Sequence, residues 1–234
     1  NLSRALGLGA AAEEPAGPVL IPMTGHILLE DGGLSWTAPG MQPVALEDLA
    51  AMLRLDPASR NLDVQFFGRS RQGDMVGTLA LEGRIRNWLD AEGVLTPATA
   101  EPDLDLSLIN LPVGLVDGLA GLDGLLLAAL GDRLALRLSS SGRQVDATVE
   151  APRLAVDLGA NLNDQRLVLT RPGALRWNLT PEFVARVSGE TEDPLRLAEA
   201  VDLRLALERF EAPLRGFDPD GIALRGRFDS SSAL

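Results

Sequence analysis

The residues best suited to catalysis are few, and they do not form a known catalytic pattern. His26 is the single histidine, and with no cysteine it lacks the partners that a zinc site needs. Asp103 and Asp105 lie two apart in an alternating stretch, so both point to one face, where paired carboxylates can act as acid and base. The leucines that alternate with them indicate a solvated strand face instead. We therefore expect a turn or strand-edge position for His26 and no catalysis by the three.

Three other short motifs each lack a residue that the corresponding functional site requires. The segment "FDPDGI" at 217–222 begins like a calcium loop, but Ile222 occupies the position of the third oxygen ligand. The run "SSSG" at 139–142 lacks the GxSxG pattern of acyl-transfer enzymes. A glycine-rich stretch near the start has no lysine after it, because the chain contains none, so it predicts no phosphate loop. The sequence predicts no enzyme, no cofactor and no metal.

Composition narrows the partners further. The chain has 234 residues, 46% of them hydrophobic, and a formal net charge of -12. Every basic residue is an arginine, set singly beside acids, which does not suit a nucleic-acid backbone. The long uncharged stretches, such as 15–29 and 106–116, are broken by proline or too short for a bilayer, which needs about 20 apolar residues. We expect neither nucleic-acid binding nor a membrane span, and the absence of cysteine leaves the compartment open.

Most of the chain alternates between apolar and polar residues. Leucine stands at Leu104, Leu106 and Leu108, and a period of two is typical of half-buried strands. The pattern recurs at Leu134, Leu136, Leu138, Leu154, Val156, Leu158, Leu167, Leu169, Leu175, Trp177, Leu179, Leu203, Leu205, Leu207, Ile222 and Leu224. Short polar turns separate these runs and favour antiparallel pairing with one wet face. Periodicity alone leaves open whether protein covers the apolar face, as in a sandwich or barrel, or leaves it free.

Three segments read as helices. At 43–55, Leu46, Leu49, Ala50 and Leu53 follow helical spacing. A second helix is predicted at 112–130, with a proline at its start and Gly131 at its end. Leucines at 115, 119, 122 and 126 form one stripe along it, and glycines at 114, 118 and 121 form another beside it. Interior glycine costs about 1 kcal/mol relative to alanine, so this helix must pack against a sheet. In "LTPEFVARV", a threonine at 180 and a proline at 181 predict one or two further helical turns.

These elements suggest an organisation along the chain. Residues 1–20 read as a loose lead-in, 21–100 as a first β unit with the 43–55 helix, and 101–234 as a second β unit with the 112–130 helix. We expect one continuous sheet rather than independent domains. The missing initiator methionine and signal peptide indicate a segment cut from a longer protein.

Several blocks resemble a known family. These blocks are "LDLSLINLPVGLVDGLAGLDGLLLAALGDRLALRL", "VDATVEAPRLAVDLGANLNDQRLVL", "LTPEFVARV", "DPLRL" and "FEAPLRGFDPDGI". Together they resemble an internal segment of the large AsmA-like, TamB-related envelope proteins, in the form found in planctomycetes. That family is understood as an inner-membrane-anchored periplasmic bridge in which β-sheet units form a long apolar groove for phospholipid passage to the outer membrane.

The resemblance carries expectations about fold and function. It implies a mainly β fold with a few short helices: an antiparallel, strongly twisted open sheet, with helices packed on or capping its apolar face. It implies non-catalytic lipid handling, with phospholipid acyl chains and neighbouring segments of the longer chain as partners. The lining would come from Leu104, Leu106, Leu134, Leu136, Leu138, Leu154, Val156, Leu167, Leu169, Trp177 and Leu203. The alternative is a structural scaffold or assembly module of an envelope protein, with a closed core and no ligand.

Overall fold

The structure is a computed structural model. It describes residues 24–37, 42–56, 58–91, 93–96, 99–163, 166–188, 196–213 and 223–232. The predicted lead-in at 1–20 and the loop at 217–222 lie outside these ranges.

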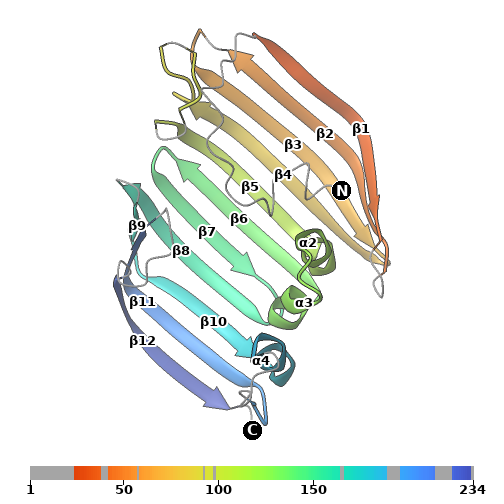
Figure 1. Ribbon diagram of the computed structural model, residues 1–234, viewed down its shortest axis with the longest axis vertical. Helices are drawn as coiled ribbons and strands as arrows, with labels where there is room; N and C mark the ends of the chain where they lie inside the picture. Colours follow the sequence, from red (N-terminus) through yellow and green to blue (C-terminus); the bar gives the residue numbers. More distant parts are fainter. Residues whose placement is uncertain are drawn as a thin grey trace.

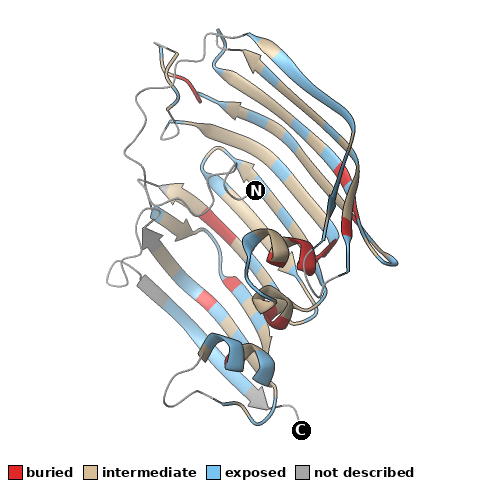
Figure 2. Cartoon of the chain, turned by 45° about the vertical axis from the view of Figure 1, so that its right-hand side comes forward, coloured by how far each residue is buried: buried red, intermediate tan, exposed pale blue. Residues whose placement is uncertain are grey.

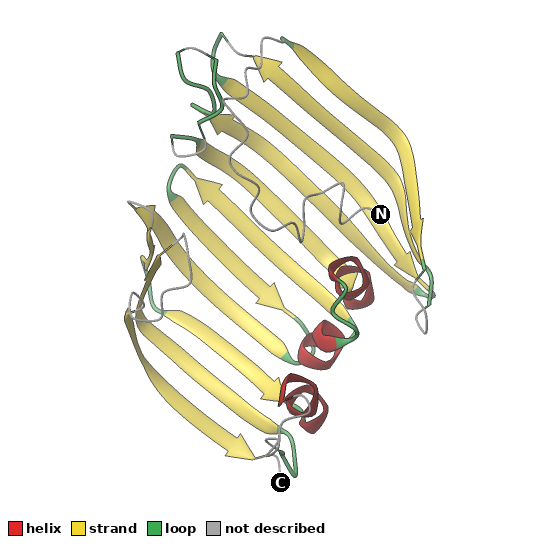
Figure 3. Ribbon diagram, in the orientation of Figure 1, coloured by secondary structure: helices red, strands yellow, loops and turns green. Residues whose placement is uncertain are grey.

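Twelve antiparallel strands form one open sheet (Figures 1 and 3). The strands are β1 Gly25–Trp36, β2 Val44–Asp56, β3 Asn61–Gln72, β4 Met75–Arg86, β5 Glu101–Pro112, β6 Arg133–Ser141, β7 Gln144–Glu150, β8 Leu154–Asn163, β9 Arg166–Leu169, β10 Gly173–Leu179, β11 Val201–Pro213 and β12 Ala223–Ser232. Strands that are consecutive in sequence pair with each other, except β9 and β10. Instead, β8 pairs with both β9 and β10, and β9 also pairs with β11. The predicted fold class, an antiparallel open sheet with a few short helices, is confirmed.

The predicted helix at 43–55 is wrong, because this segment is strand β2. A β-bulge between Glu47 and Ala50 explains the error. The extra residue, with Asp48 at φ 52°, shifts the alternation from even to odd positions. Val44 and Leu46 before the bulge therefore share a face with the odd-numbered apolar residues after it, and the interrupted period of two imitates helical spacing.

The segment 112–130 forms two short helices rather than one. They are α2 Val113–Ala120 and α3 Leu125–Leu130. Gly121 and Gly124 adopt left-handed conformations (φ 65° and 84°) and break the predicted leucine stripe. Gly114 is buried within α2, whereas Gly121 ends that helix, and no atom lies within 4 Å of the place a Cβ would take there. Gly114 thus allows close packing, whereas Gly121 and Gly124 form the turn between α2 and α3.

The third predicted helix is confirmed as α4 Pro181–Ser188. The Thr180 hydroxyl accepts a hydrogen bond from the Phe183 amide at 3.3 Å, as expected of an N-cap. All three helices of the described residues lie on one face of the sheet, along one end of the strands (Figure 3). None of the three has the length and apolar character that crossing a bilayer requires.

The two faces of the sheet follow from register. Residues paired across antiparallel strands share a face, and successive residues of one strand alternate between faces. Leu115 of α2 packs on Leu111 at the end of β5 and on Val44 of β2, with Leu79 and Leu108 beside them. We call the side that carries these leucines the helix-bearing face and the other side the opposite face.

The buried core is small and lies where the helices meet the sheet. Val44, Leu111, Leu115 and Val113 are each less than 5% exposed. Figure 2 shows the buried residues gathered at α2 and α3 and along the nearby strand ends, while most of the sheet is intermediate or exposed. Burial of the helix-bearing face is therefore a local event, confined among the described residues to one end of the strands and a few isolated positions.

Candidate functional site

The candidate site is the apolar surface of the helix-bearing face. One row of paired residues crosses eight strands in unbroken register. The row consists of Leu29, Ala51, Phe66, Leu81, Leu106, Leu138, Ala147 and Leu158. No charged residue interrupts it, so the row forms an aliphatic band perpendicular to the strands.

A second row runs parallel to the first, nearer the helices. It continues from β4 to β12 through Leu79, Leu108, Leu136, Val149, Val156, Leu175, Leu205 and Phe228. A third, on the far side of the first row, contains Ile27, Leu53, Val64, Gly83 and Leu104. Adjacent rows on one face are two residues apart, about 7 Å, which lets their side chains meet. The three rows make one continuous apolar surface.

This surface is incompletely covered. None of the predicted lining residues is buried; all eleven are of intermediate exposure. At the β1 edge, Ile27 is 60% and Leu29 44% exposed, and at the β12 edge Phe228 is 64% exposed. Large apolar side chains exposed in a contiguous set mark binding surfaces more often than isolated ones do.

The structure places the eleven predicted residues in three groups. Leu104, Leu106, Leu136, Leu138 and Val156 lie together in the middle of the helix-bearing face. A second group, nearer the helices, comprises Leu134, Leu154, Trp177 and Leu203. Leu167 and Leu169 stand apart on β9, at the other end of β8.

Trp177 belongs to the contact between helices and sheet. Its indole N–H donates to the Ala129 carbonyl of α3 at 3.1 Å. Its ring lies 4.9 Å from that of Phe183 in α4, tilted by 56°. With both helices against it, Trp177 anchors them to the sheet, and the open surface begins beyond it.

Sequence reasoning missed the contribution of the first four strands. Ile27, Leu29, Phe66 and Leu81 extend the apolar surface across β1 to β4. Bulges in β1 and β2 break the alternation there, with left-handed Asp31 and Asp48 at the irregular points. Aspartate is among the residues that tolerate this conformation, so an acid that shifts the phase of the period was the available signal.

The opposite face is charged and largely self-neutralised. On β2 to β5, five acids lie within 4 Å of an arginine: Glu47, Asp48, Asp63, Glu101 and Asp103. The hydrogen bond from Arg84 to Asp63 (2.5 Å) raises the pKa of the guanidinium. The hydrogen bond from Arg171 lowers the pKa of the Asp157 carboxyl. A polar ladder on one side and aliphatic rows on the other make the sheet strongly amphipathic.

The residues considered for catalysis stay separate. His26 is exposed on the edge strand β1, as expected. Asp103 pairs with Arg86 at 2.8 Å and accepts a hydrogen bond from the Gly142 amide, and Asp105 shares its face. Within the described ranges, no group of three metal-ligating side chains comes together.

The chain was compared with family models, curated proteins and solved structures, and none of them matches it. The AsmA-like resemblance therefore rests on the sequence blocks alone.

Proposed function

We propose that this segment handles lipid without chemistry, by holding acyl chains against the helix-bearing face of the sheet. The single observation that carries the proposal is the continuous aliphatic surface of that face, half-exposed across its middle. In a closed core the same leucines would be buried, as Leu111 and Leu115 are under α2.

The chemistry of the surface suits passage more than tight capture. Burying acyl methylenes against leucine gains about 0.8 kcal/mol each, without a directional contact. The rows contain aliphatic and aromatic side chains and few polar atoms, so they offer a chain no fixed stopping point. A headgroup would stay at the rim, where charged residues of the opposite face begin.

The resemblance to AsmA-like proteins supplies the setting of the proposal. In it, this segment is one stretch of a longer periplasmic bridge anchored in the inner membrane, and phospholipid moves along it during outer-membrane biogenesis. Among the described residues β1 and β12 are the edge strands, each paired on one side only, so neighbouring segments of the same longer chain could add to the sheet there.

The first experiment is native mass spectrometry of the bacterially expressed protein, purified without detergent, followed by extraction of bound lipid. We expect phospholipid in near-stoichiometric amount. A folded, monomeric and lipid-free protein would instead support a structural scaffold.

A pair of double variants tests where the lipid lies. Leu136→Asp with Val156→Asp places two charges on the helix-bearing face and should abolish lipid occupancy. The matched control, Thr148→Asp with Ala155→Asp, adds the same charge on the opposite face, where each new acid lies between an arginine (Arg137 or Arg176) on one neighbouring strand and an acid (Asp157 or Glu150) on the other. The control should retain lipid. Unchanged occupancy in a folded Leu136→Asp, Val156→Asp protein would rule out this face as the site.

A further inference from the structure

We propose that the opposite face carries a second, independent site, a pocket on β1 to β5 that binds a small amphipathic cation. The pocket has a volume of about 470 Å³, within the range usual for small-molecule sites. Ten of its fourteen lining residues face the side of the sheet away from the helices. The other four, Leu29, Ala51, Phe66 and Leu81, alternate with them along the strands and direct their side chains to the helix-bearing face, so an occupant of the pocket and an acyl chain would lie on opposite sides of the same strands.

Two rows of cross-strand neighbours frame the pocket. One row is Leu28, Met52, Gln65, Glu82 and Asp105. The other contains Ala50, Phe67, Ala80 and Ser107, with Glu30 beside them on β1. The pocket forms at the two alanines because their side chains are small and those around them are larger.

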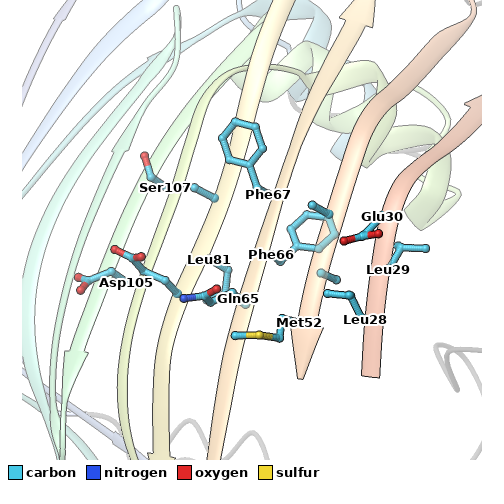
Figure 4. A pocket seen from close by; sticks show the side chains of 14 residues that line it. Leu28, Leu29, Glu30, Met52, Gln65, Phe66, Phe67, Leu81, Asp105 and Ser107 are labelled. Atoms are coloured by element: carbon cyan, nitrogen blue, oxygen red, sulfur yellow. The ribbon is translucent and has the colours of Figure 1, made fainter. Parts of the chain in front are cut away.

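The end of the pocket over β1 to β3 is mostly apolar, with the single carboxylate of Glu30 on β1. Leu28 and Phe67 are 56% and 50% exposed, although the rest of this face is dominated by charged and polar side chains. Figure 4 shows Leu28 and Met52 toward β1 and β2, with Asp105 and Gln65 toward β5. The exposed phenyl ring of Phe67 and the half-buried thioether of Met52, beside the two alanines, offer contact area to a hydrocarbon or aromatic body.

The other end is acidic and unneutralised. Glu82 and Asp105 are direct cross-strand partners on β4 and β5, a geometry in which like charges destabilise a sheet. Neither has an arginine within 4 Å among the described residues, in contrast to the five paired acids of the same strands. Arg137 of β6 is the cross-strand partner of Ser107, two residues from Asp105 on the same face, and within the described residues no salt bridge joins it to Asp105. Of the three acids in the pocket lining, Glu82 and Asp105 lie at this end and Glu30 lies on β1 at the other, and the lining contains no base.

Charge and shape together define the occupant. Strands lie about 4.8 Å apart, so Met52 on β2 and Asp105 on β5 are separated by about 14 Å. A ligand with an apolar body over β1 to β3 and one cationic nitrogen between Glu82 and Asp105 would meet both ends. It would relieve the repulsion between these carboxylates, as arginine does for their neighbours.

Methyl NMR of methionine tests the site with n-octylamine as the probe. The Met52 methyl resonance should shift saturably, while that of Met75, outside the pocket, should not. Octanoate, with the same chain length and a negative charge, should bind at least about tenfold more weakly. Equal binding of the two probes, or an unmoved Met52 resonance, would overturn the proposal.

Variants without the two carboxylates distinguish the contribution of the ligand's cationic nitrogen from that of its hydrocarbon chain. Glu82→Gln with Asp105→Asn should weaken octylamine binding about tenfold and leave thermal stability equal or higher, because the like-charge pair is gone. The control Glu150→Gln with Asp229→Asn removes the same charge from the same face outside the pocket and should bind octylamine as the wild type does. Octylamine affinity unchanged in the Glu82, Asp105 variant would refute the site. The Leu136→Asp, Val156→Asp protein should retain the Met52 shift, which keeps this test separate from the lipid test.

Discussion

The helix-covered end of the apolar surface and its open middle are built from the same residue types, yet only one of them is a core. Leu111 under α2 is 3% exposed, whereas Leu106 and Leu138 a few residues away are of intermediate exposure. The sheet is continuous through both regions. What differs is the connection between β5 and β6, which rises onto the face as α2 and α3. A strand face of leucines is therefore core or surface according to the connection above it.

The largest expected effect is a difference in stability between the two regions for the same substitution. Leu115→Ala removes buried packing among Val44 and Leu111 and should lower the free energy of unfolding by about 2–4 kcal/mol. Leu106→Ala, on the open middle, should cost about 1 kcal/mol, because its side chain gives up less burial. Urea unfolding of both variants measures the contrast.

Leu115→Met is the control for this comparison, since it conserves volume and should cost less than about 1.5 kcal/mol. Equal losses for the two alanine variants would mean that the middle of the face is as well covered as its end. The division into core and open surface would then be wrong.

A smaller effect is expected at the buried carboxylate that joins the two covering helices. Asp117 is 1% exposed and accepts hydrogen bonds from the amides of Gly124 and Leu126, at the start of α3. Asp117→Ala leaves these donors without that partner and should cost about 1–3 kcal/mol. Thermal unfolding compared with Asp123→Asn, an exposed aspartate of the same turn, provides the measurement.

Asp117→Ala should also loosen the cover itself. If the 121–124 turn holds α2 and α3 in place, Asp117→Ala should speed hydrogen exchange in α3 while the middle strands stay unchanged. Equal protection of α3 in the two proteins would show that packing alone positions the helices.

Much of this architecture was predictable from the sequence, for a local reason. From β5 to β11 leucine alternates with polar residues over most of each strand, apart from irregular points after Leu108 and Leu207. Pro112 and Gly131 mark helix ends by their backbone conformations, and Thr180 marks one by its capping hydroxyl. The strand β2 was not recognised, because a single bulge at Asp48 moves its apolar set from even to odd positions. An inserted residue interrupts a period of two, and the apolar residues on either side of it then stand at the spacing of a helix.

The candidate sites divide in the same way. The inward leucines of β5, β6 and β8 follow directly from alternation and were identified. Trp177 was grouped with them, but its role depends on Phe183, in the helix that follows its own strand, and on Ala129 of α3, which is 48 residues away in sequence. The pocket on the opposite face depends on the pairing of Glu82 with Asp105, and register between strands is not readable from either strand alone.

The smallest expected effect is on the stability that ion pairs of the charged face contribute. This contribution depends on pH, whereas that of the apolar face does not. Arg171 donates to Asp157 at 2.5 Å and lies 3.4 Å from Asp146. The pKa of Asp157 is lowered below the ordinary value of 3.8, so the folded state binds its proton less readily than the unfolded state does. The stabilisation is therefore present above that ordinary value and is lost as pH falls through the folded-state pKa.

Both partners are well exposed, so the contribution is small and screened by salt. Arg171→Gln should lower the free energy of unfolding slightly at pH 7, and the deficit should vanish near about pH 2. Leu106→Ala should show the same deficit at both pH values, because no ionisation is involved in its packing. Urea unfolding of the two variants at each pH tests this. A pH-independent Arg171→Gln deficit would mean that the arginine acts through its packing on the sheet rather than through its charge.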